Sequence, residues 1–242
     1  MQPEATGTYF LAVSIAMIFS VIADFGITPV IIREIAKHPD ETQHIFRRAL
    51  AAKIPLFLLG YLCTVFAAVL LGYNREMIAF TMLSGLSLLL DSIHLMFYGV
   101  LRGHQQLQVE AVGMFGGQLV VAFVGGLVLY LSPSLTVLLG ALVAGSAFNV
   151  CVSGFVVAKR FGARLFVPTV DVAFLKSLFV TALPFALAAI FVKVYSYVDT
   201  VFISKLLDTT AVGLYSIAYK LTYAFQFLPL ASLHGENIVK KS

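Results

Sequence analysis

The sequence predicts an all-α, polytopic membrane protein, because it is strongly apolar, its apolar residues form long runs, and its cations gather in alternate connectors. Hydrophobic residues occupy 60% of the 242 positions and charged residues only 12%, whereas about 25% of a soluble domain is charged. The apolar runs are ~20 residues or longer, the length that a helix needs to cross a bilayer. A transmembrane barrel would show ~10-residue alternating segments instead, and the sequence has no such segments.

Seven membrane spans are expected, covering about 8–32, 50–72, 77–101, 111–131, 135–157, 179–204 and 213–233. The connectors between them fall into two alternating sets, one with twelve cations and the other with only Arg75 and Lys205. Cations concentrate on the cytoplasmic side of membranes, so we expect a cytoplasmic (inner) membrane protein with Met1 outside and Ser242 inside. The net charge of +4 follows from this topology, and no nucleic-acid partner is expected. The twelve cations are Arg33, Lys37, Arg47, Arg48, Lys53, Arg102, Lys159, Arg160, Arg164, Lys176, Lys240 and Lys241.

Two connectors on the cytoplasmic side have a structural interpretation. Residues 33–49 should extend the flanking helices beyond the headgroups, with a break near His38-Pro39-Asp40, because proline ends a helix. Residues 158–176 form the longest polar stretch and are expected to link two lobes.

A weak internal repeat supports a two-lobe organisation. Gly7 and Gly213 are separated by 206 positions, as are Tyr9 and Tyr215, and both pairs open an apolar span. The second copy follows the span 179–204, whereas the first has no span before it. We therefore expect a fragment of a transporter with roughly twelve or more helices in two similar lobes. Its parts would be an N-lobe (1–157), a cytoplasmic linker (158–176) and the start of a C-lobe (177–242).

The span 77–101 and the residue after it carry a polar stripe. Its members are spaced by 4, 3, 4 and 4 residues, which places them within an arc of about 80° on a helix. Such a stripe can line a cavity, with Asp91 holding and releasing a proton near His94, or it can be a hydrogen-bonded seam between helices. Both interpretations remain open at this point. The stripe consists of Ser87, Asp91, His94, Tyr98 and Arg102.

Four more ionisable residues lie in apolar spans and are functional candidates, because charge at bilayer depth is costly. Lys193 either lines a cavity for an anionic substrate or pairs with Asp91 or Asp24. Asp199 lies six residues further along, too far for a pair within one helix, and has an interfacial or a functional role. Lys220 either extends to the headgroups or binds substrate. Asp24 precedes Gly26 and Pro29 and either stabilises a kink or couples an ion.

The remaining patterns exclude some classes of protein. The frequent glycines, among them Gly113, Gly116, Gly117, Gly125, Gly126, Gly140 and Gly145, indicate close helix packing rather than a phosphate loop. The sequence shows no metal-ligand cluster and no spacing typical of hydrolytic or transferase chemistry. We therefore expect no cofactor, no metal and no enzymatic activity.

Two segments resemble the polysaccharide-transporter, or O-antigen flippase, family, which groups with lipid II flippases and multidrug-and-toxin-extrusion transporters. They are GTYFLAVSIAMIFSVIADFGITPVIIREIAK and YSYVDTVFISKLLDTTAVGLYSIAYKLTY. The diagnostic patterns are Asp24-Phe25-Gly26 followed by Arg33-Glu34, and Asp199 followed by Gly213-x-Tyr215. The resemblance covers nearly the whole chain except about the last eight residues. It implies two six-helix lobes around a cavity and a polyprenyl-diphosphate-linked oligosaccharide as substrate.

These observations together predict a flippase that moves this lipid-linked oligosaccharide outward by alternating access, for cell-surface polysaccharide biosynthesis. The expected substrate-binding residues are Lys193, Arg102, His94, Tyr98 and Lys220. The expected partners are the lipid-linked substrate, membrane lipids and a coupling ion, a proton or sodium, at Asp91, Asp24 or Asp199. The main alternative is a cation-coupled multidrug or metabolite exporter of the same fold. A membrane glycosyltransferase would need larger loops than these, and the ionisable stripe argues against a scaffold without transport.

Overall fold

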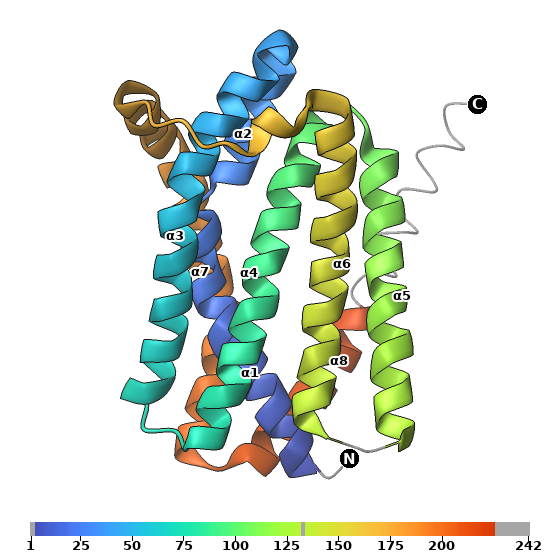
Figure 1. The fold of residues 1–242 in the computed structure, drawn as a ribbon. Coiled ribbons are helices and arrows are strands. Elements are labelled where there is room, and N and C mark those ends of the chain that lie inside the picture. The colour runs from blue at the N-terminus through green and yellow to red at the C-terminus, as the bar shows by residue number, and fades with distance from the viewer. Residues whose placement is uncertain (1–2, 132–133, 226–242) are drawn as a thin grey trace, which may run out of the picture. The chain divides into compact units, whose positions relative to one another are not determined.

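The computed structural model describes residues 3–131 and 134–225, and within these ranges every regular element is a helix. The predicted all-α class is therefore confirmed. Figure 1 shows the elements along the chain. They are α1 (Pro3–Asp24), α2 (Ile27–Lys37), η1 (Pro39–Glu41), α3 (Thr42–Leu70), α4 (Arg75–Gly103), α5 (Leu107–Leu131), α6 (Leu135–Phe161), η2 (Ala163–Phe166), α7 (Val172–Leu206) and α8 (Thr209–Phe225).

Within the described residues, six helical stretches are long and apolar enough to cross a membrane, so the chain is a multi-pass membrane protein. These stretches are Pro3–Lys37, Pro39–Leu70, Arg75–Gly103, Leu107–Leu131, Leu135–Phe161 and Val172–Leu206, and they correspond to the first six predicted spans. The seventh predicted span, 213–233, runs past residue 225, and Ser242 also lies outside the described part of the chain.

The predicted break at the first cation-rich connector is confirmed. α2 ends at Lys37, Pro39 opens the short helix η1, and α3 begins at Thr42. Pro39 has no N–H to continue the α2 ladder, whereas its fixed φ suits the first turn of η1. The Thr42 hydroxyl donates to the Pro39 carbonyl over 2.6 Å and so closes the turn.

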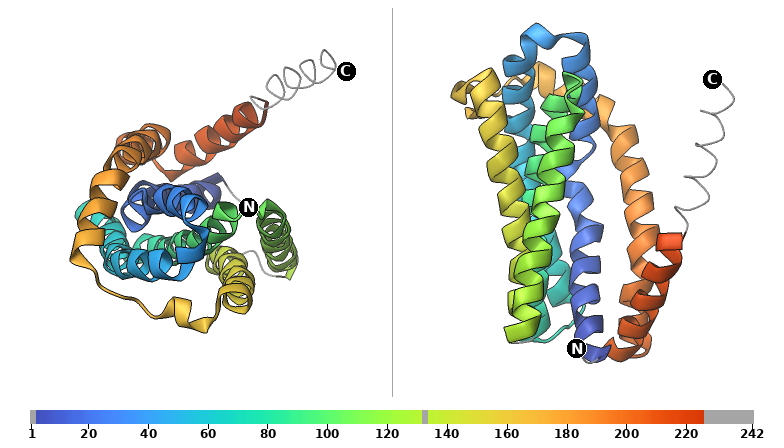
Figure 2. Two further views of the ribbon diagram at one scale, coloured as in Figure 1. Left: turned by 90° about the horizontal axis from the view of Figure 1, so that it is seen from above. Right: turned by 90° about the vertical axis from the view of Figure 1, so that its right-hand side faces the viewer.

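The chain divides into two compact units, one of residues 12–199 and one of residues 1–11 with 200–242. In the larger unit, α6 packs against both α4 and α5, and α4 also contacts α2 and α3, as the views in Figures 1 and 2 show. The core of this unit is concentrated toward one end. It includes Ile27, Val30, Ile31, Ile35, Ile45, Phe46, Ala49, Phe97, Leu101, Val157, Leu165, Leu178 and Ala182.

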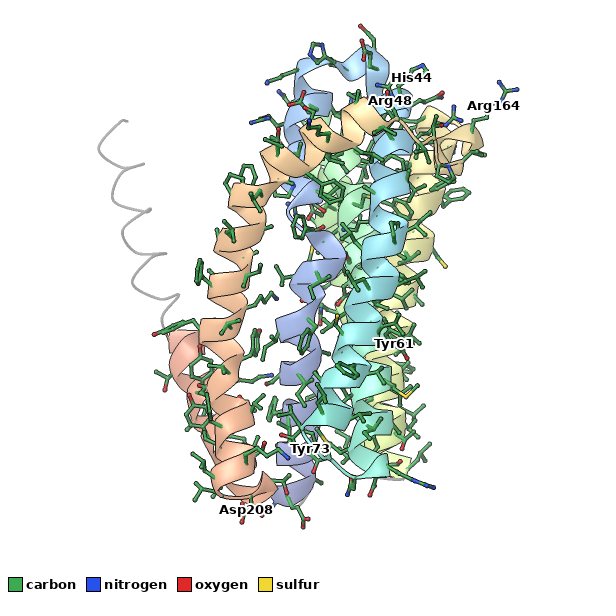
Figure 3. All side chains as sticks on the ribbon, turned by 90° about the vertical axis from the view of Figure 1, so that its left-hand side faces the viewer. His44, Arg48, Tyr61, Tyr73, Arg164 and Asp208 are labelled. Atoms are coloured by element: carbon green, nitrogen blue, oxygen red, sulfur yellow. The ribbon has the colours of Figure 1, made fainter. Side chains whose placement is uncertain are left out.

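The same end of the larger unit carries many cations, and we call it the cation-rich end. Figure 3 shows His44, Arg48 and Arg164 there, with Tyr73 at the opposite end. The clustering agrees with the predicted positive-inside pattern, although which membrane face this end occupies stays a prediction.

The connector between α6 and α7 lies against the beginning of α3. The Arg47 side chain donates to the Val167 carbonyl over 2.8 Å, and the Thr169 amide donates to the Arg47 carbonyl over 3.1 Å. Arg48 forms an ion pair of 3.4 Å with Asp171. The predicted linker is thus attached to α3, while its role between two lobes remains a prediction.

In the smaller unit, α1 and α8 approach each other through the glycines of the predicted repeat. A Cβ atom at Gly7 would overlap the Thr209 carbonyl, and one at Gly213 would overlap the Pro3 carbonyl. Pro3 and Thr209 are separated by the same 206 positions as the two glycines. Shifting Gly7 and Pro3 by 206 positions gives Gly213 and Thr209, so the Gly7–Thr209 contact and the Gly213–Pro3 contact are equivalent. Helices related by a two-fold axis make contacts of this kind.

Candidate functional site

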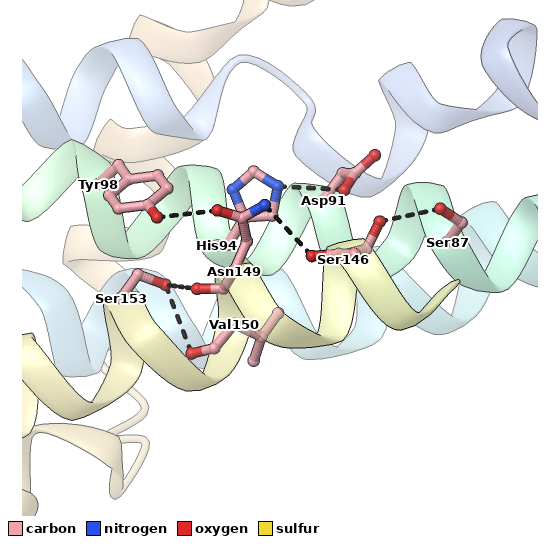
Figure 4. Close-up of polar contacts among 9 residues, drawn as sticks. Ser87, Asp91, His94, Tyr98, Ser146, Asn149, Val150 and Ser153 are labelled. Atoms are coloured by element: carbon pink, nitrogen blue, oxygen red, sulfur yellow. Dashed lines mark hydrogen bonds and ion pairs between the residues drawn. The ribbon is translucent and has the colours of Figure 1, made fainter. Parts of the chain in front are cut away.

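The polar stripe on α4 faces α6 over much of its length. Ser87 Oγ lies 2.9 Å from Ser146 Oγ, and the Tyr98 hydroxyl donates to Asn149 Oδ1 over 3.0 Å. Asn149 Nδ2 in turn donates to the Gly145 carbonyl over 3.2 Å. Figure 4 shows these contacts along the two helices. Ser87 and Tyr98 therefore belong to an interhelical hydrogen-bond seam, the second of the two interpretations of the stripe.

Asp91 and His94, two members of the stripe, contact each other on α4. His94 Nε2 lies 3.0 Å from Asp91 Oδ1, with the His94 side chain 6% exposed and the Asp91 side chain 35% exposed. His94 Nδ1 is buried and has no hydrogen-bond partner among the described residues. A buried polar atom without a partner costs about 1–3 kcal/mol, so this nitrogen is suited to binding a water molecule.

Glycines allow α5 and α6 to approach the seam closely. A Cβ atom at Gly113 would overlap the Tyr98 hydroxyl, and one at Gly117 would overlap Asn149 Nδ2. A Cβ atom at Gly145 would overlap Val121. Close helix packing is thus the role of these three glycines, as predicted, whereas Gly126 and Gly140 have no atom within 4 Å of the position that a Cβ would occupy.

Arg102, a predicted substrate-binding residue, is bound by a carboxylate on the next helix. Its guanidinium donates two hydrogen bonds to the two carboxylate oxygens of Glu110 on α5. The Glu110 side chain is 8% exposed and that of Arg102 is 37% exposed. Bidentate pairs of this kind are strong and geometrically specific, so the charge of Arg102 is largely compensated within the bundle.

Asp24 is paired with Lys53, which the sequence analysis assigned to a cytoplasmic connector. Lys53 lies inside α3 with 1% of its surface exposed, and its Nζ lies 2.5 Å from Asp24 Oδ1. The Thr28 hydroxyl donates to the same oxygen over 2.5 Å. The placement of Lys53 in the connector was wrong, because an ammonium this deeply buried needs a carboxylate partner and finds one on the neighbouring helix.

Lys193 differs from Lys53 in the quality of its partners. Its Nζ lies 3.3 Å from the Met17 sulfur and 5.6 Å from the centre of the Tyr197 ring. No carboxylate lies within 4 Å of this ammonium in the described part of the chain, and Asp91 acts on it electrostatically from further away. A thioether is a weak acceptor and an ammonium has three donors, so Lys193 keeps hydrogen-bonding capacity for a ligand.

The other two predicted residues lie toward the far end of α7 and on α8. Lys220 is exposed, and its Nζ lies 4.2 Å from the centre of the Phe10 ring, a cation–π contact. Asp199 is half-buried on α7. In the larger unit, Asp91 contacts His94 and acts on Lys193 electrostatically from a greater distance. Lys220 belongs to the smaller unit.

Sequence reasoning missed two ion-pair partners, Lys53 and Glu110. Both had a detectable signal. Glu110 follows Arg102 by eight positions across a short turn, and such spacing brings side chains of antiparallel helices together. Lys53 lies two residues before Pro55 in an apolar stretch, where an isolated cation indicates a buried partner.

The described residues contain no group of three or more histidine, cysteine, aspartate or glutamate side chains that could hold a metal ion. Three of the predicted ionisable residues, Asp24, Asp91 and Arg102, are instead paired with Lys53, His94 and Glu110, respectively. The binding roles expected of Lys193, Asp91 and His94 stay predictions.

The comparisons with known proteins agree with the resemblance noted in the sequence. A family model described as polysaccharide biosynthesis protein matches residues 1–233. No curated protein and no solved structure matches the chain. Because the family match covers most of the chain, this protein belongs to the polysaccharide biosynthesis protein family, the family of polysaccharide and O-antigen flippases and related transporters.

Proposed function

We propose that the protein takes part in moving a polyprenyl-diphosphate-linked oligosaccharide from the cytoplasmic to the outer leaflet of the cytoplasmic membrane. The cation-rich end would face the cytoplasm. Alternating access would move the headgroup, while the prenyl chain stays among the membrane lipids. A diphosphate cannot cross hydrocarbon unaided, because an isolated charge in an apolar medium is very costly. The protein must therefore offer a compensating cation along the way.

The observation that supports this proposal is the set of groups around the Lys193 ammonium. Lys53 and Arg102 are each paired with a carboxylate. Among the residues that the structure describes, the near partners of Lys193 are a thioether and an aromatic ring. A diphosphate oxygen would be a much better acceptor than the Met17 sulfur. Lys193 is accordingly assigned the role of binding the anionic headgroup.

Asp91 is the carboxylate assigned to the coupling ion. Asp24 is neutralised by Lys53, so a further cation there would have to displace a buried ammonium. Within the described part of the chain, the polar partner of Asp91 is the His94 ring at 3.0 Å, and 35% of the Asp91 side chain is exposed. A proton or a sodium ion at Asp91 would alter the electrostatic environment of Lys193 and so link the ion to the substrate.

The same charges favour an anionic substrate over the cationic drugs of an exporter. An exporter of cations needs free carboxylates in its cavity, whereas Asp24 and Glu110 are compensated by Lys53 and Arg102. Asp91 is not compensated in this way, but it contacts His94 and acts electrostatically on the Lys193 ammonium, which would repel a cationic drug.

Binding of a lipid diphosphate to the protein in nanodiscs tests this function. Geranylgeranyl diphosphate is the anionic probe and tetraphenylphosphonium is the cationic one. Lys193→Gln should weaken binding of the diphosphate roughly 10- to 100-fold, since a hydrogen bond to a charged group contributes about 1.5–3 kcal/mol. Lys176→Gln, at an exposed position of the same helix, is the matched control and should bind like the parent protein. Equal losses in both variants, or preferential binding of the phosphonium, would contradict the proposal.

A further inference from the structure

Three of the long helical stretches contain a place where the regular backbone hydrogen-bond ladder is broken, and we call these three places interruptions. The first interruption separates α1 from α2, where Phe25 has φ 45° and Gly26 has φ 68°. Glycine adopts such angles freely, whereas a bulky residue does so at a cost of about 1–3 kcal/mol. Strained residues of this kind persist only where the surrounding structure holds them, and they cluster at switch regions.

The other two interruptions are prolines inside α3 and α7, at Pro55 and Pro184. Each proline lacks an N–H, so the carbonyl four residues earlier, at Ala51 or Val180, has no ordinary helical partner. Proline in a helix interior is a usual cause of bending. The described helices α4, α5 and α6 contain no such residue.

The three interruptions lie side by side. A Cβ atom at Gly26 would be 2.7 Å from the Ala182 carbonyl and 2.8 Å from Phe185 Cβ, on either side of Pro184. The Phe25 and Phe179 rings meet edge to face at 5.7 Å. The interruption in α3 joins this group through Lys53, because its ammonium binds Asp24, the last residue of α1.

The burial of side chains differs on the two sides of the three interruptions. Toward the cation-rich end, Ile27, Phe46 and Leu178 belong to the continuous buried core. Beyond Pro55, many side chains of α3 are exposed, with Leu62 and Phe66 each at 63%, whereas Ile15 of α1 stays buried at 1%. The interruptions therefore mark the end of the continuous core cluster, beyond which α3 is less enclosed than α1.

We propose that these interruptions form one hinge and that the Asp24–Lys53 ion pair is its latch. The segments of α1, α3 and α7 beyond the hinge would bend relative to the core at the cation-rich end. The latch is closed in this structure, with both the Lys53 ammonium and the Thr28 hydroxyl on one oxygen of Asp24. Opening it exposes two charges, so the pair holds the three helices in one conformation until water or a ligand replaces the lost contacts. The hinge would bend in the same way whatever substrate the protein carries.

Hydrogen–deuterium exchange of the full chain in nanodiscs, without any substrate, tests the hinge. In the parent protein, amides 21–28, 51–57 and 180–186 should exchange faster than those of α4. Removing either charge, in Asp24→Asn or Lys53→Met, should accelerate exchange in all three segments together by at least about tenfold, because each leaves a buried charge uncompensated. Pro184→Ala restores the N–H of residue 184, which can donate to the Val180 carbonyl. This variant should therefore slow exchange in residues 180–186.

A second pair provides the control. Glu110→Gln weakens the Arg102 pair, which lies away from the interruptions in sequence, and should change exchange only near that pair. Acceleration confined to residues 21–28 in Asp24→Asn would show that no shared hinge exists, as would uniform protection through all three segments. If the single variants do not fold, two other variants still show whether the three segments move together. They are the neutral double variant Asp24→Asn/Lys53→Met and the variant Pro184→Ala. These results are independent of whether the lipid diphosphate binds.

Discussion

Adding one methyl group to α5 should have opposite effects at two glycines. At Gly113 a Cβ atom would overlap the hydroxyl of Tyr98, and Tyr98 is completely buried, so its ring cannot move into solvent. At Gly126 no atom lies within 4 Å of the added position. Gly113→Ala and Gly126→Ala therefore make the same chemical change on the same helix in two different surroundings.

The expected magnitudes follow from these surroundings. Overpacking a filled site costs about 1–3 kcal/mol, and displacing the Tyr98 hydroxyl also loses its 3.0 Å hydrogen bond to Asn149, worth about 1 kcal/mol. Replacing a helical glycine by alanine returns up to ~1 kcal/mol. Gly113→Ala should thus destabilise the protein by roughly 1–3 kcal/mol, and Gly126→Ala should leave stability unchanged or raise it by up to ~1 kcal/mol.

Unfolding in mixed micelles with increasing SDS measures this difference. The chain has no tryptophan, so circular dichroism is the suitable signal. Tyr98→Phe in the Gly113→Ala background removes the overlapping oxygen and should recover much of the loss. If Gly113→Ala is as stable as Gly126→Ala, then α4 and α5 do not pack as described, and the role assigned to Gly113 is wrong.

Three smaller effects on stability can be measured by unfolding experiments. A double-mutant cycle of Ser87→Ala and Ser146→Ala should give a coupling energy of about 0.6–1.7 kcal/mol, as expected for one interhelical hydrogen bond, and additive effects would contradict it. Asn74 caps α4 by accepting from the Met77 amide over 2.8 Å, so Asn74→Ala should lower stability by about 0.5–2 kcal/mol. Burial lowers the pKa of His104, which follows α4 outside the spans, so the unfolded chain binds more protons there and stability should fall as pH drops below about 6.5. In thermal unfolding between pH 8 and pH 5, His104→Gln should show a smaller loss of stability than the parent protein.

The sequence was sufficient to predict the features that depend on local pattern. Hydropathy predicts the spans, because a helix must cover the full hydrocarbon thickness with apolar side chains. Pro39 predicts the break between α2 and α3, because the missing N–H acts within one turn. The placement of Ser87 and Tyr98 on one face of α4 follows from helical periodicity alone. Each of these predictions needs only the residue and its near neighbours in sequence.

Contacts between distant residues could not be predicted in this way. Lys53 is buried because α3 begins well before it and because Asp24 of a neighbouring helix faces it. Both conditions depend on the tertiary structure. The choice between seam and cavity wall for the stripe on α4 also depends on Ser146 and Asn149 of α6. The positive-inside rule considers where a cation lies relative to a span and does not consider whether the cation is buried. Counting cations by this rule therefore placed Lys53 among the cytoplasmic ones.

The proposed function depends on a difference between the partners of the Lys53 and Lys193 ammonium groups. Both are ammonium groups in apolar helices, and a hydropathy scale treats them alike. Lys53 has a carboxylate within hydrogen-bond distance, so adding an anion there would require breaking a buried pair, which typically costs 3–5 kcal/mol. Lys193 would exchange a thioether contact of 3.3 Å for a phosphate oxygen, with little to lose. A diphosphate should therefore bind at Lys193 while Lys53 continues to hold the three interrupted helices together, and substitutions at the two positions should separate binding from conformation.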